Sequence, residues 1–378
     1  MRTVGVEEEL LLVDPHTGRP VNLASRVLLA TTEVTEAQAR DAGGQVESEL
    51  HRTMVETQSA VATDLASVRE DLIGWRRRTS AAARRQGAAL AALATSPVAY
   101  DGVITANERY EWMAERYGVT ATQVLSCGCH VHVGIESEEE GIGVIDRMRR
   151  WLPVLLAISA NSPFTGGQDT SYASYRSQMW VRWPSAGPTD AFGTPEAYHA
   201  LVADMVSSGV VLDEGMVYFD ARLSRRYPTV EVRVADVCMD VEDALLVAAL
   251  TRGLVDTSAA AWALGEPAPD VPTALIRLAM WQAGREGVDG MLLDPQVFTP
   301  GPALAVVRQL VDHVRESLDA HGDLDLVEAG VERLAHVGNG ASRQRRAFER
   351  TGRLLDVVAE ATQVTVASED SQPTEKGA

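Results

Sequence analysis

The chain has 378 residues, 46% of them hydrophobic, which is enough to bury a large core in one or two domains. Its formal charge of −19 disfavours nucleic acid and anionic membranes as partners, whereas divalent cations would be attracted. Three cysteines are too few for a disulfide framework, glutamates interrupt the N-terminal stretch where a signal peptide would be apolar, and no apolar run approaches membrane-spanning length. We therefore expect a globular, cytosolic protein.

Strand-like and helix-like segments are interleaved without a regular βαβ alternation, which predicts an α+β fold. The segments with alternating or β-branched stretches are 2–13, 52–59, 89–95, 123–135, 172–183 and 228–235. The helix-like segments are 61–86, 107–117, 139–160 and 195–208, followed by an almost wholly helical run from 241 to 366. We expect one domain over residues 1–366, with the sheet in about 1–240 and helices in about 241–366, and a disordered tail over 367–378.

The first strand, "TVGVEEELLLVD", carries two carboxylates on one face. Because side chains alternate along a strand, Glu7 and Glu9 point the same way, and Glu8 lies on the opposite face with Leu10 and Leu12. Neighbouring carboxylates repel each other unless a cation lies between them. The stretch therefore indicates a cation site.

The next strand, "TMVETQ", places Glu56 as a third candidate ligand. Glu49 and His51 are weaker candidates, because an exposed turn would leave both in solvent. The arginine-rich segment 75–85 fits a solvated helix face better than a polyanion site in so acidic a protein.

The stretch "CGCHVHVG" contains two cysteines and two histidines. On a strand, Cys127 and Cys129 share a face with Val131 and Val133, while His130 and His132 share the other. Zinc ligation by all four side chains is therefore disfavoured, and the cysteines are expected in the core. Carboxylates with imidazole suit Mg²⁺ or Mn²⁺ bound partly by substrate phosphates.

The stretch "RLSRRYPTVEVRVADV" repeats the pattern. Glu231 and Arg233 stand together opposite a valine face. The preceding Arg222, Arg225 and Arg226 would supply phosphate contacts. Neither a Walker A loop nor a kinase-like glycine loop occurs, so ATP would be bound without them.

These segments together resemble the type-2 glutamate–cysteine ligase family, in its bacterial branch of carboxylate–amine ligases within the glutamine synthetase superfamily. The resemblance rests on "GVEEELLLVD", "MVETQSAV", "CGCHVHVG", "ANSPFTGGQDTSYASYRSQMWVRWPSAG" and "RYPTVEVRVADVC", in this order, and covers nearly all of the chain except the tail. It implies a curved antiparallel sheet backed by helices, with the polar residues lining one face. Ser171 departs from the family, which often has glycine there, and a small change in the amino-acid pocket would follow.

The resemblance also implies a role for each polar residue. Glu7, Glu9 and Glu56 would bind one cation, and His130 with Glu231 a further one. His132 would lie on the side of the acidic substrate or nucleotide, and Arg233 would contact the transferred phosphoryl group with help from Arg222, Arg225 or Arg226. The tract 161–183 would form a substrate-side loop and strand, in which Arg176 meets a substrate carboxylate.

The implied activity is ATP-dependent ligation of a carboxylate to an amine through an acyl phosphate, with Mg²⁺ or Mn²⁺ as cofactor, small-molecule substrates and a homodimeric assembly. Glutamate and cysteine are the family's usual pair, on which this branch is expected to be weak or divergent. The alternatives are a ligase for another acid and amine, a phosphotransferase acting on a guanidino nitrogen, a zinc hydrolase and a non-catalytic relic. The last is disfavoured because a relic has no chemical reason to keep repelling carboxylates adjacent.

Overall fold

The computed structural model describes residues 1–38, 45–100 and 102–367. Its centre is a seven-stranded sheet in which every described strand pair is antiparallel. Six strands follow the order β2 (Gln45–Ser48), β3 (Met54–Gln58), β1 (Val4–Val13), β5 (Gly128–Gly134), β9 (Thr229–Asp236) and β8 (Ala221–Leu223), and β4 (Ala89–Ala91) pairs with β1. Two small hairpins complete the strands: β6 (Phe164–Thr165) with β7 (Gln168–Asp169), and β10 (Met291–Leu293) with β11 (Pro300–Pro302).

Helices connect the strands and form most of the chain after β9. Before β9 they are α1 (Ala24–Gln38), α2 (Leu65–Arg85), α3 (Glu108–Tyr117), α4 (Val119–Gln123), α5 (Glu138–Met148), α6 (Leu152–Ser159), α7 (Tyr175–Trp180) and α8 (Pro195–Ser207), with short 3₁₀ turns at Arg149–Trp151 and Glu214–Met216. After β9 they are α9 (Val241–Ala263), α10 (Thr273–Glu286), α11 (Ala303–His313), α12 (Arg315–His321), α13 (Leu324–Val337), α14 (Gly340–Thr351) and α15 (Leu354–Val366).

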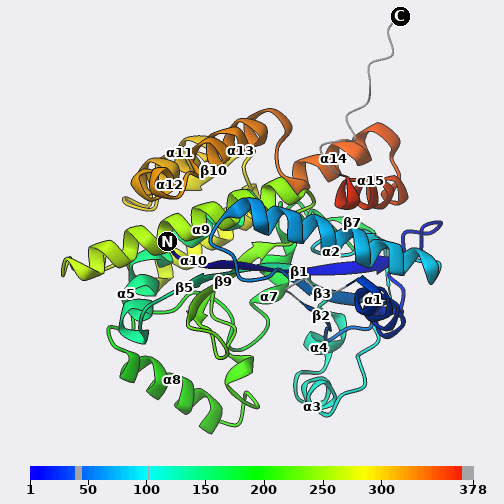
Figure 1. Cartoon of the computed structure of the whole chain (residues 1–378), viewed down its shortest axis with the longest axis horizontal. Helices are drawn as coiled ribbons and strands as arrows, with labels where there is room; N and C mark the ends of the chain where they lie inside the picture. The colour runs from blue at the N-terminus through cyan, green and yellow to red at the C-terminus, as the bar shows by residue number, and fades with distance from the viewer. Residues whose placement is uncertain (39–44, 101, 368–378) are drawn as a thin grey trace, which may run out of the picture.

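The main core lies on one face of the sheet. Val131 and Val133 of β5 and Val230 and Val232 of β9 pack with buried residues of α2, α5, α6 and α9. Figure 1 shows α2 and α9 running along one side of the sheet, with α3 and α8 on the other. With the apolar sides of the strands covered in this way, the polar sides of β1, β5 and β9 face a separate space.

Helix α9 differs from expectation in one respect. It is long and apolar enough to cross a membrane by length and composition, although no such run was predicted from the sequence. The fold buries 78% of its most apolar window, which is the behaviour of a core helix.

The antiparallel register determines which polar residues become neighbours. Glu7 lies opposite His130, Glu9 opposite Glu56, and Glu231 opposite both His132 and Arg222. A shift by one residue would move all of these side chains to the core face. The sheet therefore assembles carboxylates and imidazoles from separate parts of the chain.

The α+β class and five of the six predicted strands are confirmed, with shorter bounds for several of them. The prediction of a strand over 172–183 is wrong, because this segment contains helix α7. The Ser174 side chain accepts a hydrogen bond from the Ser177 backbone N–H, which caps the helix, and Arg176 and Met179 form its buried side. The predicted disordered tail lies, apart from Ala367, outside the described residues.

The arginine-rich segment on α2 was also misjudged in part, because Arg76 is fully buried. Its guanidinium donates to both carboxylate oxygens of Glu8, at 2.7 and 2.8 Å, and to the backbone carbonyls of Cys238 and Met239. Glu8 is equally buried. This ion pair joins β1 to α2 and to the chain that follows β9.

Candidate active site

A cavity of about 440 Å³ lies on the polar face of the sheet, and we call it the carboxylate cavity. Most of its charged lining comes from β1, β3, β5, β9 and the loops beside them. Its charged and imidazole-bearing residues are Glu7, Glu9, Glu47, Glu49, His51, Glu56, Arg109, His130, Arg222, Arg225, Arg226, Glu231 and Arg233. The predicted site residues Glu7, Glu9, Glu56, His130 and Glu231 are thus brought together.

One cluster in this region combines Glu7, His132 and Glu231, whose potential ligand atoms all lie within 4.8 Å of one another. Glu7 also lies 3.3 Å from Nδ1 of His130 and 3.4 Å from Nε2 of His132. Burial would raise the pKa of Glu7, but the two imidazoles outweigh that effect and hold the pKa well below its usual range. Glu7 is therefore a carboxylate ready to bind a cation.

A second cluster contains only carboxylates, from Glu9, Glu49 and Glu56, again with potential ligand atoms within 4.8 Å. Burial and the charge of Glu9 raise the pKa of Glu49 to about 7. Burial and the charge of Glu49 likewise raise the pKa of Glu56. Three acidic groups this close resist ionising together, which is the electrostatic condition that a divalent cation relieves.

The two histidines lie in different surroundings. His132, expected on the substrate side, is the imidazole that shares a cluster with Glu7 and Glu231, and its Nδ1 lies 3.0 Å from Oγ1 of Thr229. His130 is buried against Glu7, and burial together with Arg233 lowers its pKa. Nε2 of His130 is buried with no hydrogen-bond partner among the described residues, as a free ligand atom would be.

Arginines border the Glu7–His132–Glu231 cluster on the β8–β9 side. Arg233 pairs with Glu231, and Arg222 donates to the same carboxylate at 2.8 and 3.2 Å. Burial alone would raise the pKa of Glu231, but the two guanidiniums hold it well below its usual range. Arg225 and Arg226 line the cavity farther out, where half-exposed Arg225 lies 3.8 Å from Asp213.

Hydrophobic and aromatic side chains form another part of the wall, which the sequence did not predict. They come from α3, α7 and the segments around 183 and 218, and they are Tyr110, Met113, Trp180, Trp183 and Tyr218. The guanidinium of Arg233 lies 5.7 Å from the ring centre of Trp180 and 5.9 Å from that of Tyr218. The cavity therefore has a charged floor and a partly apolar side, as a site for an organic substrate requires.

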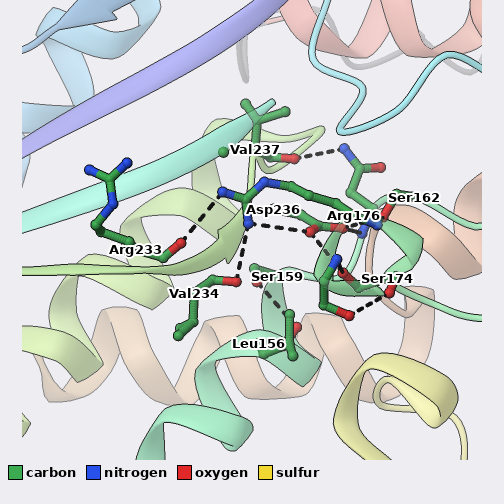
Figure 2. A network of polar contacts seen from close by, with 12 residues as sticks. Leu156, Ser159, Ser162, Ser174, Arg176, Arg233, Val234, Asp236 and Val237 are labelled. Carbon is green, nitrogen blue, oxygen red and sulfur yellow. Dashed lines mark hydrogen bonds and ion pairs between the residues drawn. The ribbon is translucent and has the colours of Figure 1, made fainter. Parts of the chain in front are cut away.

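Arg176 does not line the carboxylate cavity, although we expected it to meet a substrate carboxylate there. It is 1% exposed and lies 3.9 Å from Asp236, and it donates long hydrogen bonds to the carbonyls of Arg233 and Val234. Figure 2 shows its guanidinium beside the Arg233 backbone, while the Arg233 side chain points away from it. In this structure Arg176 is a buried residue that contacts the backbone of β9.

Asp236 is the centre of that buried network. It accepts hydrogen bonds from the hydroxyls of Ser162 and Ser174 and from the Asn161 backbone N–H (Figure 2). These contacts hold the segment 161–176 against Asp236, the last residue of β9. The spacing of hydroxyls in the sequence gave no sign of this convergence.

The cysteines behave as predicted. Cys127, Cys129 and Cys238 are buried and unpaired, and Cys129 packs in the same core cluster as Val131 and Val133. Neither ligand cluster found among the described residues includes a cysteine. A β-bulge between Cys129 and Val131 offsets the register without moving the histidines to the core side.

An antiparallel sheet with carboxylates, imidazoles and arginines gathered over one face defines a candidate cation-dependent enzyme that acts on charged substrates. The family model for glutamate–cysteine ligase family 2 matches residues 3–360, and the chain belongs to that family.

Comparison with individual proteins agrees with this assignment. The chain is 52% identical to "Putative glutamate–cysteine ligase 2-1" of Streptomyces avermitilis, over 97% of this chain and 99% of that protein. It is also 52% identical to "Putative glutamate–cysteine ligase 2" of Streptomyces coelicolor, over 97% of this chain and all of that protein. Among solved structures, the glutamate–cysteine ligase of Francisella tularensis in complex with AMP has a similar fold, with a TM-score of 0.65 and 13% identity over 97% of this chain and 89% of that one.

Proposed function

We propose that the protein is an ATP-dependent carboxylate–amine ligase of the glutamate–cysteine ligase type. The observation that carries the proposal is a pair of three-residue ligand clusters near Arg233 and Arg222: five of the six residues line the carboxylate cavity, and the sixth, His132, lies beside Glu7. Membership of the family and the fold shared with an AMP-bound ligase support it. Glutamate and cysteine are the proposed substrates by family, with another acid and amine as the alternative.

The residues fit divalent cations held by oxygen and imidazole. Glu9, Glu49 and Glu56 would hold one ion, and Glu7, His132 and Glu231 another, with His130 adjacent. When bound, Mg²⁺ or Mn²⁺ would neutralise charge on the phosphate oxygens. A cation held by Glu9, Glu49 and Glu56 would also offset the repulsion among these carboxylates, which together with burial raises the pKa of Glu49 and Glu56.

The arginines are the residues of this chain that we propose act during phosphoryl transfer. The substrate carboxylate attacks the terminal phosphorus of ATP, the bond to ADP breaks, and an acyl phosphate forms. The amine then attacks the acyl carbon, and orthophosphate leaves as the amide forms. Arg233 and Arg222 are proposed to stabilise charge on the transferred phosphoryl group, with Arg225 and Arg226 binding phosphates nearer the opening.

The test is a screen for ADP release that crosses amino acids and dicarboxylates with a panel of amines, in the presence of Mg²⁺ or Mn²⁺. Hydroxylamine belongs in the amine panel, because it converts an acyl phosphate to a hydroxamate whatever the natural amine is. We expect ADP and orthophosphate in equal amounts with an amide or hydroxamate, and no product from Arg233→Ala. Formation of AMP and pyrophosphate would refute the proposal, and ADP with a phosphorylated guanidine would favour the phosphotransferase.

A further inference from the structure

A second cavity, of about 420 Å³, lies behind Trp180 and shares only that residue with the carboxylate cavity. We call it the side pocket. Its walls come from α7, from the segment 186–188, from Asp220 just before β8, and from α10. The side chains that matter to its chemistry are Arg176, Trp180, Asp220, Arg277, Met280 and Trp281.

Asp220 is the unusual residue in this pocket. It is 6% exposed, and its carboxylate makes no hydrogen bond within the described part of the chain; Oδ2 is buried without a partner. Its backbone, by contrast, is held on both sides: its N–H donates to the Gly187 carbonyl, and its carbonyl accepts from the Arg233 N–H. A buried carboxyl held this firmly and left unpartnered costs free energy unless a ligand supplies the missing donor.

The rest of the lining limits which kinds of ligand could supply a hydrogen-bond donor to Asp220. Met280 and Trp281 form an apolar wall on α10, and Trp281 is kept in place by an edge-on contact with Tyr172, at 6.2 Å between ring centres. Arg277, exposed on the same helix, brings a positive charge to the pocket. Arg176 lies 3.9 Å from Asp236, and its positive charge also acts on Asp220.

We propose that the side pocket binds an α-amino acid with an apolar side chain, as its zwitterion. The ammonium group donates to Asp220, the carboxylate pairs with Arg277, and the side chain packs on Met280 and Trp281. A ligand with both charges pairs with both residues, whereas a simple amine leaves Arg277 unused and a simple acid leaves Asp220 unpartnered. Trp180 separates this ligand from the cation ligands, so its binding requires neither ATP nor a cation.

The experiment is calorimetric titration of the protein with L-leucine, L-methionine and L-phenylalanine, in EDTA and without nucleotide. At least one is expected to bind in the millimolar range or tighter. Its N-acetyl derivative and its amide are each expected to bind about tenfold more weakly or worse, because each loses one charged contact. Asp220→Asn and Arg277→Gln should weaken binding by a similar factor.

Matched controls are Asp204→Asn on α8 and Arg182→Gln, both exposed and outside the pocket lining. Both should bind like the unmodified protein, and circular dichroism with thermal melting checks that every variant is folded. Glu231→Gln, in the carboxylate cavity, should also leave the affinity unchanged.

No binding by any of the three amino acids would overturn the proposal, as would affinities unaffected by both pocket variants. Binding lost in Glu231→Gln but kept in Asp220→Asn would place the amino acid in the carboxylate cavity and would also overturn it. Because ADP release is not measured here, failure of this proposal is distinct from failure of the ligase activity.

Discussion

Replacing Arg76 with methionine tests the buried ion pair beneath the cavity floor. Arg76 and Glu8 have side chains that are 1% and 0% exposed, and two hydrogen bonds at 2.7 and 2.8 Å join them. The same guanidinium donates to the carbonyls of Cys238, at 2.7 Å, and Met239, at 2.9 Å. The substitution therefore leaves one buried carboxylate and two buried carbonyls without their donor.

The cost follows from those three acceptors. Breaking a buried ion pair from one side costs about 3–5 kcal/mol, since the remaining charge is uncompensated. Each carbonyl that water cannot reach adds roughly 1 kcal/mol. Against a typical stability of about 5–15 kcal/mol, Arg76→Met should lose a large part of the free energy of unfolding. The double variant Glu8→Leu, Arg76→Met should recover part of the loss, because no charge is left buried.

The assay is urea unfolding followed by circular dichroism, and Arg77→Met is the matched control. Arg77 is the next residue on the same helix and is exposed, so the same change there should alter stability by roughly 0.5 kcal/mol or less. If Arg76→Met and Arg77→Met unfolded at the same urea concentration, the argument that Arg76 compensates Glu8 would be wrong.

Five further outcomes are expected. Burial raises the pKa of Asp220 from 3.8 to about 7, so the folded state favours the neutral acid, and the stability that this provides is full below pH 3.8 and lost as the pH rises through 7. Asp220→Asn should therefore raise Tm at pH 8, by the equivalent of no more than about 4 kcal/mol, and by less at pH 5; an equal effect at both pH values would contradict the assignment. Glu231→Gln should raise the Mg²⁺ concentration needed for ADP release, with partial rescue by excess Mg²⁺. Arg233→Lys should reduce kcat by roughly two to three orders of magnitude with little change in nucleotide binding. Wild-type turnover of the Arg233→Lys variant would contradict the role of Arg233 in phosphoryl transfer. Cys129→Ala should lower Tm modestly and keep the cation dependence, and loss of bound metal on that change would contradict the strand-face argument. Ser171 has a backbone φ of 64°, so Ser171→Gly should stabilise the fold by about 1 kcal/mol in urea unfolding, and a lower midpoint would show that the serine side chain matters more than the strain.

The polar face could be predicted from the sequence because strand alternation has a period of two. Once β1, β5 and β9 were recognised as strands, the positions of Glu7, His130 and Glu231 along them determined which face of the sheet each side chain lies on. The order of the strands did not follow from alternation. That order, like the pairing of Glu9 with Glu56, is known only from the structure.

Residues outside regular strands were harder to predict. Glu49 follows β2 in a loop, where no periodicity indicates burial, yet its carboxylate joins Glu9 and Glu56. The sequence gave no sign of the hydrogen bond from Thr105 Oγ1 to the Glu49 carbonyl, which fixes that loop. The segment around Arg176 was predicted to be a strand because "SYRSQMW" also alternates. Its capping serine, Ser174, is the sequence signal that indicates a helix instead.

Three consecutive glutamates on β1 show how one residue type can serve two purposes. Glu8 faces the core, where Arg76 compensates its charge permanently through two hydrogen bonds. Glu7 and Glu9 face the cavity, where Glu9 shares a cluster with Glu49 and Glu56 and, although it interacts with the charge of Arg233, forms no ion pair with an arginine among the described residues. An arginine fixed beside Glu9 would have satisfied it and left no coordination position for a cation. We propose that the repulsion among Glu9, Glu49 and Glu56 is what would favour a divalent ion there, while the compensated pair behind it holds the strand in place despite that repulsion.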